Sequence, residues 1–180
     1  MTGAGKPGRA RHDLGNLRHA QVCRPTSIHL LRRLVEAVPV ADRAGMLTGT
    51  FLDLGCGKGG TLHAARQIGF ARAVGVEFVD AFADIAEANL RRLGVTGAEV
   101  VRGDAAACDP PAGLRFLFMF NPFGEAVMRP AMRRIAGVPA RPLYIGHVYP
   151  EVEHVLAEEL PVMEVVHDLP AWSARLFRVP

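Results

Sequence analysis

A glycine-rich stretch in the first third of the chain has the residue types of a ligand-binding turn. Residues 53–60 read DLGCGKGG, at the end of the short apolar run 50–54 and before a segment that can form a helix. Glycine permits positive φ angles and close approach of a ligand, and a helix beginning here offers free N–H groups. These features predict a nucleotide-like ligand at the carboxyl end of a parallel sheet. Gly55, Gly57 and Gly60 also satisfy GxGxxG, so the glycines alone do not distinguish S-adenosylmethionine from NAD.

Three acidic residues end three successive predicted strands. Asp53 precedes the glycines, where a carboxylate would repel the pyrophosphate of a dinucleotide but attract the ammonium group of S-adenosylmethionine. Glu77 ends the second strand and could accept both hydroxyls of a ribose, whichever ligand carries it. Asp104 follows the third strand, in position to accept a hydrogen bond from an adenine amino group. One such acid could equally be a helix cap or a surface charge, but three at successive strand ends favour a ligand site.

A second candidate site follows the fourth predicted strand, at the same edge of the sheet. Asn121 offers a carbonyl acceptor, Pro122 restrains the turn, and Phe123 offers a flat apolar wall. We interpret these three residues as catalytic because of their position. The alternative is an ordinary strand-ending turn, since Asn-Pro-Phe-Gly is favourable turn chemistry.

The histidines and cysteines predict no metal site. The seven histidines lack HxxxH or facial-triad spacing, and Cys23, Cys56 and Cys108 form no CxxC or Cys/His cluster. Among the histidines, His147 at the end of the fifth predicted strand is placed to line an acceptor pocket. Cys56 lies inside the glycine turn, where a small side chain fits, and a reactive thiol is the less favoured interpretation.

The elements that position these residues alternate between strands and helices. The first helix is predicted from about residue 28, with Thr26 or Ser27 as N-cap and Pro39 near its end, and residues 41–49 are interpreted as a polar connection. Strands are predicted at 50–54, 73–77, 99–102, 115–120 and 142–148, and further helices at 61–68, 81–93, 125–136 and 151–160. Pro130 is expected to kink or interrupt the helix at 125–136.

The end of the chain has a different pattern, which completes the fold prediction. Residues 162–168 and 173–179 are strand-like and are joined by a link that is too short for a helical crossover, so they predict an antiparallel pair. Five βα units followed by a hairpin predict an α/β fold. We expect a Rossmann-like, doubly wound and mostly parallel seven-stranded sheet with an antiparallel C-terminal hairpin.

Composition predicts one domain in a reducing compartment. The chain has 180 residues, 49% hydrophobic and 22% charged, and no disulfide framework, which favours a cytoplasmic location. No apolar run approaches the roughly 20 residues needed to span a bilayer. Residues 1–22 hold much of the net charge of +3 and predict a flexible basic arm, followed by one domain at 23–180. Such an arm could contact nucleic acid, but a solvated tail is the favoured interpretation.

Taken together, the motifs resemble those of class I, seven-β-strand S-adenosylmethionine-dependent methyltransferases from about residue 24 to the C-terminus. Residues 53–59 are similar to the first motif of that family, Glu77 and Asp104 match its ribose and adenine acids, and the hairpin matches its reversed last strand. The resemblance implies that Gly55 and Gly57 pass beneath the methionine part of the cofactor. It also implies that Asp53 acts through ordered hydrogen bonds, either to the ligand or to the turn. The cofactor-binding residues expected from this resemblance are Thr26, Asp53, Gly55, Cys56, Gly57, Glu77, Asp104, Ala105 and Asn121.

A closer similarity is to a small bacterial branch that combines a Pro-Thr-Pro-type element, a GCGKG turn and an Asn-Pro-Phe motif. Here these elements read RPTS at 24–27, GCGKG at 55–59 and NPF at 121–123. In the resembling families the Pro-Thr segment folds over the cofactor, where Arg24 could pair with the carboxylate; a plain helix cap is equally favoured. Lysine methyltransferases of the same fold share the Pro-Thr and acidic-glycine elements. Gly60 and Ser27 depart from their pattern, which leaves the acceptor open.

The leading hypothesis is therefore methyl transfer from S-adenosylmethionine to an amine nitrogen of a protein lysine or a small molecule. It rests on the similarity of residues 121–123 to Asn-Pro-Pro-Tyr-type motifs, whose carbonyls orient an amine. An NAD-dependent oxidoreductase is the alternative enzyme, which Asp53 and the absence of a Tyr-x-x-x-Lys pair oppose. A non-catalytic module that binds S-adenosylmethionine or nucleic acid is the third hypothesis, supported by the basic arm. No membrane partner is predicted.

Overall fold

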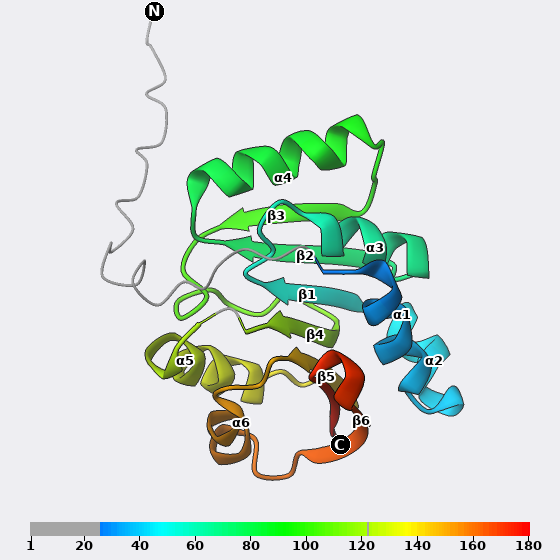
Figure 1. Cartoon of the computed structure of the whole chain (residues 1–180), viewed down its shortest axis with the longest axis vertical. Helices are drawn as coiled ribbons and strands as arrows, with labels where there is room; N and C mark the ends of the chain where they lie inside the picture. Colours follow the sequence, from blue (N-terminus) through cyan, green and yellow to red (C-terminus); the bar gives the residue numbers. More distant parts are fainter. Residues whose placement is uncertain (1–25, 122) are drawn as a thin grey trace, which may run out of the picture.

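The computed structural model describes residues 26–121 and 123–180, which form a seven-stranded sheet flanked by helices (Figure 1). The predicted arm at 1–22, together with Cys23, Arg24, Pro25 and Pro122, lies outside the described residues. The strand order is β3-β2-β1-β4-β5-β7-β6, and only β7 runs opposite to its neighbours. The strands are β1 (Thr50–Leu54), β2 (Arg72–Glu77), β3 (Ala98–Arg102), β4 (Leu114–Phe120), β5 (Leu143–Val148), β6 (Glu164–Leu169) and β7 (Ala174–Val179). The predicted α/β, Rossmann-like sheet with its C-terminal hairpin is confirmed.

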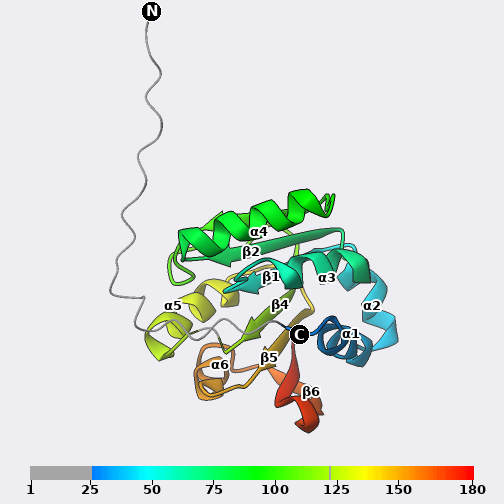
Figure 2. The ribbon, with the colours of Figure 1, turned by 45° about the horizontal axis from the view of Figure 1, so that its top comes forward.

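Helices cover both faces of this sheet, and each face has its own apolar core. Figure 2 shows α3 and α4 on one side and α5 and α6 on the other. Leu62 of α3 and Leu90 of α4 belong to the first core, whereas Met128 of α5 and Leu156 of α6 belong to the second. The helices are α1 (Ile28–Ala37), α2 (Val40–Leu47), α3 (Gly60–Ile68), α4 (Asp80–Arg92), α5 (Glu125–Ala136) and α6 (Glu153–Glu159). Within the described ranges, no helix is both long and apolar enough to cross a membrane.

The predicted connection at 41–49 is wrong, because the chain forms helix α2 there. Long-range and local hydrogen bonds hold this helix in place. The Tyr144 hydroxyl in β5 donates to Asp42 Oδ2 at 2.5 Å, and the Arg43 guanidinium donates to the carbonyls of Glu36 and Val38 at 2.6 and 2.9 Å. The apolar periodicity of so short a segment is weak, and Gly45 lowers its helix propensity. Tertiary contacts decide the outcome.

The expected alternation of five βα units is also incomplete, since the described residues between β3 and β4 contain no helix. This connection holds the consecutive prolines Pro110 and Pro111, which are incompatible with a helix interior. One face of β3 therefore has no helical cover, and Val101 is 37% exposed. Helix α5, by contrast, is not interrupted, and Pro130 lies within its continuous span.

Gly75 in β2 allows the glycine turn after β1 to lie against the sheet. A Cβ atom at Gly75 would lie 2.5 Å from Cys56 Sγ and 2.9 Å from Leu62 Cδ1. These separations are far below van der Waals contact, so only glycine permits the observed packing of Cys56. The turn that carries the candidate ligand site therefore depends on a glycine in the neighbouring strand.

We expect Gly75→Ala to destabilise the fold by about 1–3 kcal/mol, because the added methyl group overpacks the space occupied by Cys56. Gly45→Ala is the matched control. It adds the same methyl group inside α2 with no atom within 4 Å, and should stabilise by about 0.5–1 kcal/mol. Urea unfolding of both variants and the wild type tests this. Equal stability of Gly75→Ala and the wild type would contradict the packing argument.

Candidate cofactor and acceptor site

The glycine turn after β1 has the backbone conformation that its sequence predicts. The φ angles of Gly55, Gly57 and Gly59 are 86°, 54° and 80°, a region that residues with a Cβ rarely adopt. The amides of Gly55 and Cys56 donate to the Val76 carbonyl at 2.9 and 3.1 Å, which fastens the turn to β2. The turn leads directly into α3, so the first N–H groups of that helix lie beside it. This arrangement suits a ligand that approaches the main chain closely.

The Glu77 carboxylate connects the end of β2 with the glycine turn. Its Oε2 accepts from the Gly57 amide and its Oε1 from the Val79 amide, both at 2.8 Å. Burial raises the pKa of Glu77, and backbone N–H donors partly offset this effect. Each carboxylate oxygen has a second lone-pair direction, so ribose hydroxyls could still donate to it.

Asp53 is buried at the end of β1, where its Oδ2 accepts a hydrogen bond from the Thr61 hydroxyl in the first turn of α3. Burial raises the pKa of Asp53 to about 7, while the Thr61 hydroxyl opposes the shift and the charge of Glu77 adds to it. Of the two partners expected for Asp53, the ligand or the turn, the structure shows hydrogen bonding to the helix that follows the turn. Sequence reasoning missed Thr61 as its partner, although a hydroxyl at the start of the helix was a visible signal.

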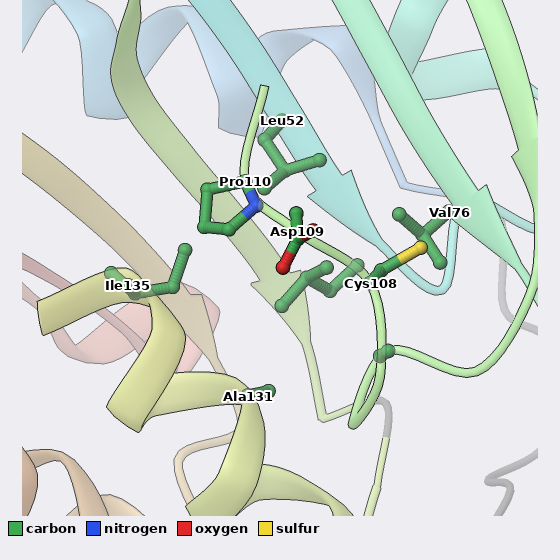
Figure 3. A pocket seen from close by; sticks show the side chains of 9 residues that line it. Leu52, Val76, Cys108, Asp109, Pro110, Ala131 and Ile135 are labelled. Atoms are coloured by element: carbon green, nitrogen blue, oxygen red, sulfur yellow. The ribbon is translucent and has the colours of Figure 1, made fainter. Parts of the chain in front are cut away.

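Asp104 and Ala105 lie just beyond β3, at the same sheet edge as Glu77. Asp104 Oδ1 accepts from the Ala106 amide at 2.9 Å, and the Gly103 amide donates to the Glu77 carbonyl at 3.0 Å. Ala105 is buried and lines a small, mostly apolar hollow beneath the β3–β4 connection (Figure 3). Its other lining residues include Leu52, Val76, Cys108, Ala131 and Ile135. The hollow lies on the sheet face that faces α5, where the chain lacks a helix between β3 and β4.

Asn121 is the residue immediately after β4. Its main chain has a φ of 36°, and its amide donates to the Val148 carbonyl at the end of β5 at 2.9 Å. The residue is 9% exposed, and within residues 26–121 and 123–180 its Oδ1 has no hydrogen-bond partner. A buried carbonyl without a donor costs free energy unless something supplies that donor. Phe123 is half-buried and packs against the core on the α5 face.

Not every predicted residue has a distinct role in this arrangement. Thr26 is half-buried beside Ser27, and Ser27 is the cap of α1, accepting from the His29 amide at 3.2 Å. The Cys56 side chain is buried toward Gly75, so we expect only its main chain to meet a ligand. Cofactor contacts of Thr26 and Cys56 therefore stay predictions.

His147 does not line the acceptor edge. It shares a sheet face with Leu143 and Ile145, in the core beneath α5 and α6, and is fully buried. Neither ring nitrogen has a hydrogen-bond partner among the residues that the structure describes, and burial lowers the pKa of His147 to about 4. Sequence reasoning placed it at the right strand end but could not assign the face.

Two aromatic residues at the acceptor edge were missed. Phe120 ends β4 and Tyr149 follows β5, and their ring centroids are 5.4 Å apart in an edge-on arrangement. Their positions were the available signal, because Phe120 ends a predicted strand and Tyr149 stands between a predicted strand and Pro150. Among the described residues, no group of His, Cys, Asp and Glu is arranged to hold a metal ion.

Comparison with known proteins agrees with this geometry. Residues 51–139 match a family model described as "Methyltransferase domain". This chain carries a methyltransferase domain. The match begins in β1 and runs through α5, so it includes the glycine turn, Glu77, Asp104 and Asn121. No curated protein matches the chain significantly.

Solved structures with the same fold as this methyltransferase domain are numerous, although their sequences are distant. The yhhF protein of Escherichia coli, itself a proposed methyltransferase, is 20% identical, with a TM-score of 0.66 over 89% of this chain and 90% of its own. An RNA methyltransferase from Salinibacter ruber, in complex with S-adenosylhomocysteine, is 17% identical, with a TM-score of 0.61 over 87% and 94%. A ribosomal protein L11 methylase from Lactobacillus delbrueckii is 16% identical, with a TM-score of 0.61 over 83% and 75%. The predicted class I methyltransferase fold is thus confirmed, while the relation to lysine methyltransferases stays a prediction.

The raised pKa of Asp53 makes the free energy of unfolding depend on pH. The folded chain keeps a proton up to about pH 7, whereas the ordinary value is 3.8. Between these values the unfolded chain binds fewer protons, so rising pH should lower stability by up to about 1.4 kcal/mol per pH unit.

His147 acts in the opposite direction, because the unfolded chain binds its proton between the folded value of about 4 and 6.5. The informative quantity is therefore the difference in stability between the wild type and Asp53→Asn, from urea unfolding at several pH values. The wild type should lose stability relative to the variant from about pH 4 to 7. A difference independent of pH would contradict the assignment.

Proposed function

We propose that this chain transfers a methyl group from S-adenosylmethionine to an amine nitrogen that Asn121 holds. The observation that carries the proposal is the buried Asn121 Oδ1, a carbonyl that accepts no hydrogen bond from the part of the chain that the structure describes. Asn121 directly follows β4, which is the neighbour of β1 and its glycine turn, since Phe118 of β4 pairs with Asp53 of β1. An amine that donates to this oxygen would lie at the carboxyl edge, next to the cofactor.

The residues on the β1 to β3 side suit S-adenosylmethionine better than a dinucleotide. The glycine turn would pass beneath the methionine part, Glu77 would accept the ribose hydroxyls, and Asp104 with Ala105 would meet the adenine. Asp53 and Glu77 place two carboxyl groups at the turn, and the negative charge they carry when ionised would repel a pyrophosphate. These features, together with the methyltransferase domain, oppose an NAD-dependent oxidoreductase. The S-adenosylhomocysteine complex of the Salinibacter ruber protein supports the same cofactor.

When bound, S-adenosylmethionine supplies an electrophilic methyl group on a sulfonium. The protein's task is then alignment, because a well-oriented nucleophile can gain about 7–11 kcal/mol from proximity. By accepting a hydrogen bond from one N–H group of the amine, Asn121 Oδ1 would orient the nitrogen lone pair toward the methyl group. Pro122 would restrain the turn, and Phe123 would provide an apolar wall. The main-chain bond from Asn121 to Val148 holds the carbonyl against β5.

Several classes of methyl acceptor carry an amine that fits this proposal. A protein lysine and a small molecule follow from the resemblance of residues 121–123 to amine-binding motifs. The similar structures include an RNA methyltransferase and a ribosomal protein methylase, so an RNA amine joins these classes. A non-catalytic binding module is the weaker alternative, because it leaves the donor-less Asn121 carbonyl without a role.

Calorimetric titration with S-adenosylhomocysteine and with NAD tests the cofactor. We expect the wild type to bind S-adenosylhomocysteine and not NAD. Glu77→Ala should weaken this binding at least about tenfold, since it removes the ribose acceptor and frees the Gly57 amide. Gly45→Ala in α2 is the control and should bind like the wild type. Binding of NAD alone would overturn the proposal.

Loss of the Asn121 carbonyl should lower turnover about 10- to 100-fold with little change in cofactor affinity. Asn121→Ala removes the carbonyl, and Asn121→Gly removes it without straining the positive φ. Both variants should be impaired to a similar degree in methyl transfer from labelled S-adenosylmethionine. An Asn121→Gly variant with wild-type turnover would contradict the role of the side chain.

A further inference from the structure

Non-glycine residues with positive φ angles lie together at the acceptor edge of the sheet. Among the described residues, the non-glycine residues with positive φ are Asn121 at 36°, Tyr149 at 49° and Ser173 at 46°. They adjoin β4, β5 and β7, which are neighbours in the sheet. Such conformations persist only where the surroundings enforce them, and they cluster at functional sites.

Hydrogen bonds connect these three residues into one wall. The Asn121 amide donates to the Val148 carbonyl at 2.9 Å, and the Tyr149 amide donates to the Ser173 carbonyl at 2.7 Å. The wall therefore extends from the fourth strand, through the fifth, to the reversed seventh strand. A side chain on this wall is held at a fixed place relative to the Asn121 carbonyl.

Tyr149 supplies an aromatic ring on this wall. Its ring lies edge-on to Phe120 at an interplanar angle of 62°, and the residue is 41% exposed. Phe120 directly precedes Asn121, and Tyr149 directly follows Val148, whose carbonyl accepts from the Asn121 amide, so the ring pair comes from the residues next to this main-chain contact. An exposed aromatic ring beside a polar acceptor suits a ligand that is flat and carries a hydrogen-bond donor on its rim.

We propose that Tyr149 positions the acceptor, and that the acceptor is a nucleobase of single-stranded nucleic acid that bears an exocyclic amine. This inference rests on the proposed function. The base stacks on the Tyr149 ring while its amine donates to Asn121 Oδ1. The amine nitrogen forms a bond to the methyl carbon of S-adenosylmethionine. The carbon–sulfur bond breaks with its electron pair left on sulfur, and one amine proton passes to water.

The charges at this edge favour a base over a lysine side chain. A lysine ammonium must lose a proton before its nitrogen can attack, and the Asn121 amide cannot take up that proton. An exocyclic base amine is uncharged at neutral pH. The acids Glu153 and Asp168 are already paired with Arg175, at 2.7 and 3.7 Å. The acceptor residues themselves, Phe120, Asn121 and Tyr149, carry no charge.

The composition of the N-terminal residues fits the same partner. Residues 1–25 contain five basic residues against one acid, and phosphate backbones bind such segments through charge. Stacking on an aromatic ring and charge along the backbone are the two means by which proteins bind single-stranded nucleic acid. This composition is therefore compatible with single-stranded nucleic acid as the partner.

Trp172 provides a direct readout, because it is the single tryptophan of the chain and is 40% exposed. It directly precedes Ser173, whose carbonyl accepts from the Tyr149 amide. The full-length chain, saturated with S-adenosylhomocysteine, is titrated with a mixed-sequence single-stranded RNA and followed by tryptophan fluorescence. A lysine-rich peptide of similar length is titrated in parallel. We expect the RNA, and not the peptide, to change the fluorescence.

Two variants separate the contribution of the Tyr149 ring to RNA binding from that of the backbone conformation at this position. Tyr149→Phe keeps the ring, and Tyr149→Asn removes it while tolerating positive φ. At one fixed salt concentration, Tyr149→Asn should weaken RNA affinity about 5- to 150-fold, and Tyr149→Phe should be close to the wild type. Both should bind S-adenosylhomocysteine normally. Equal RNA affinity of Tyr149→Asn and the wild type would overturn the inference.

Labelled methyl transfer separates this inference from the function on which it rests. Label in RNA that depends on Tyr149 supports both proposals. Label in the peptide and not in RNA overturns the nucleobase acceptor and leaves the methyltransferase proposal standing. Failure to bind S-adenosylhomocysteine overturns the proposed function, whereas the Tyr149 comparison still decides whether the wall binds RNA.

Discussion

Burial of the Asp53 and Glu77 carboxylates beneath one glycine turn is the constraint on which the cofactor side of the structure depends. Removing a carboxylate from water is costly unless donors are supplied, and the raised pKa values of both acids reflect that cost. The donors come from the turn and its helix, through the Gly57 amide and the Thr61 hydroxyl. The acids therefore fix the turn, and the turn makes burial of the acids tolerable.

This arrangement also explains why small residues recur around the turn. Gly59 lies where a Cβ would be 3.1 Å from Ala86 Cβ in α4, and Gly75 leaves room for Cys56. The turn is thereby packed between β2 and α4 with little space to move. A rigid main chain suits a site that recognises its ligand through closely approaching backbone groups. The loss of a helix between β3 and β4 leaves this packing intact, because the missing helix would lie on the opposite face.

The acceptor side of the sheet depends on a different feature, the antiparallel strand β7, which lies between β5 and β6. Its insertion brings the Ser173 carbonyl to the Tyr149 amide at the end of β5. The Val148 carbonyl at the end of β5 in turn accepts a hydrogen bond from the Asn121 amide, directly after β4. The hairpin at the end of the chain thus supports residues more than twenty positions earlier, and one sheet edge serves both the cofactor side and the acceptor side.

The sequence by itself determined the strand order along the chain, the glycine turn, and the acids at successive strand ends. These features follow from local properties: apolar runs with a period of two or 3.6, and glycines that permit positive φ. Only the tertiary structure decided that residues 40–47 form a helix tied to Tyr144, which is 102 residues beyond Asp42. It likewise decided that His147 faces the core, that the Asn121 carbonyl is buried without a donor among the described residues, and that the Tyr149 ring packs against Phe120. The reason is physical: periodicity reports which residues are apolar, whereas burial of a polar atom, its partners and its pKa depend on neighbours that are distant in the chain.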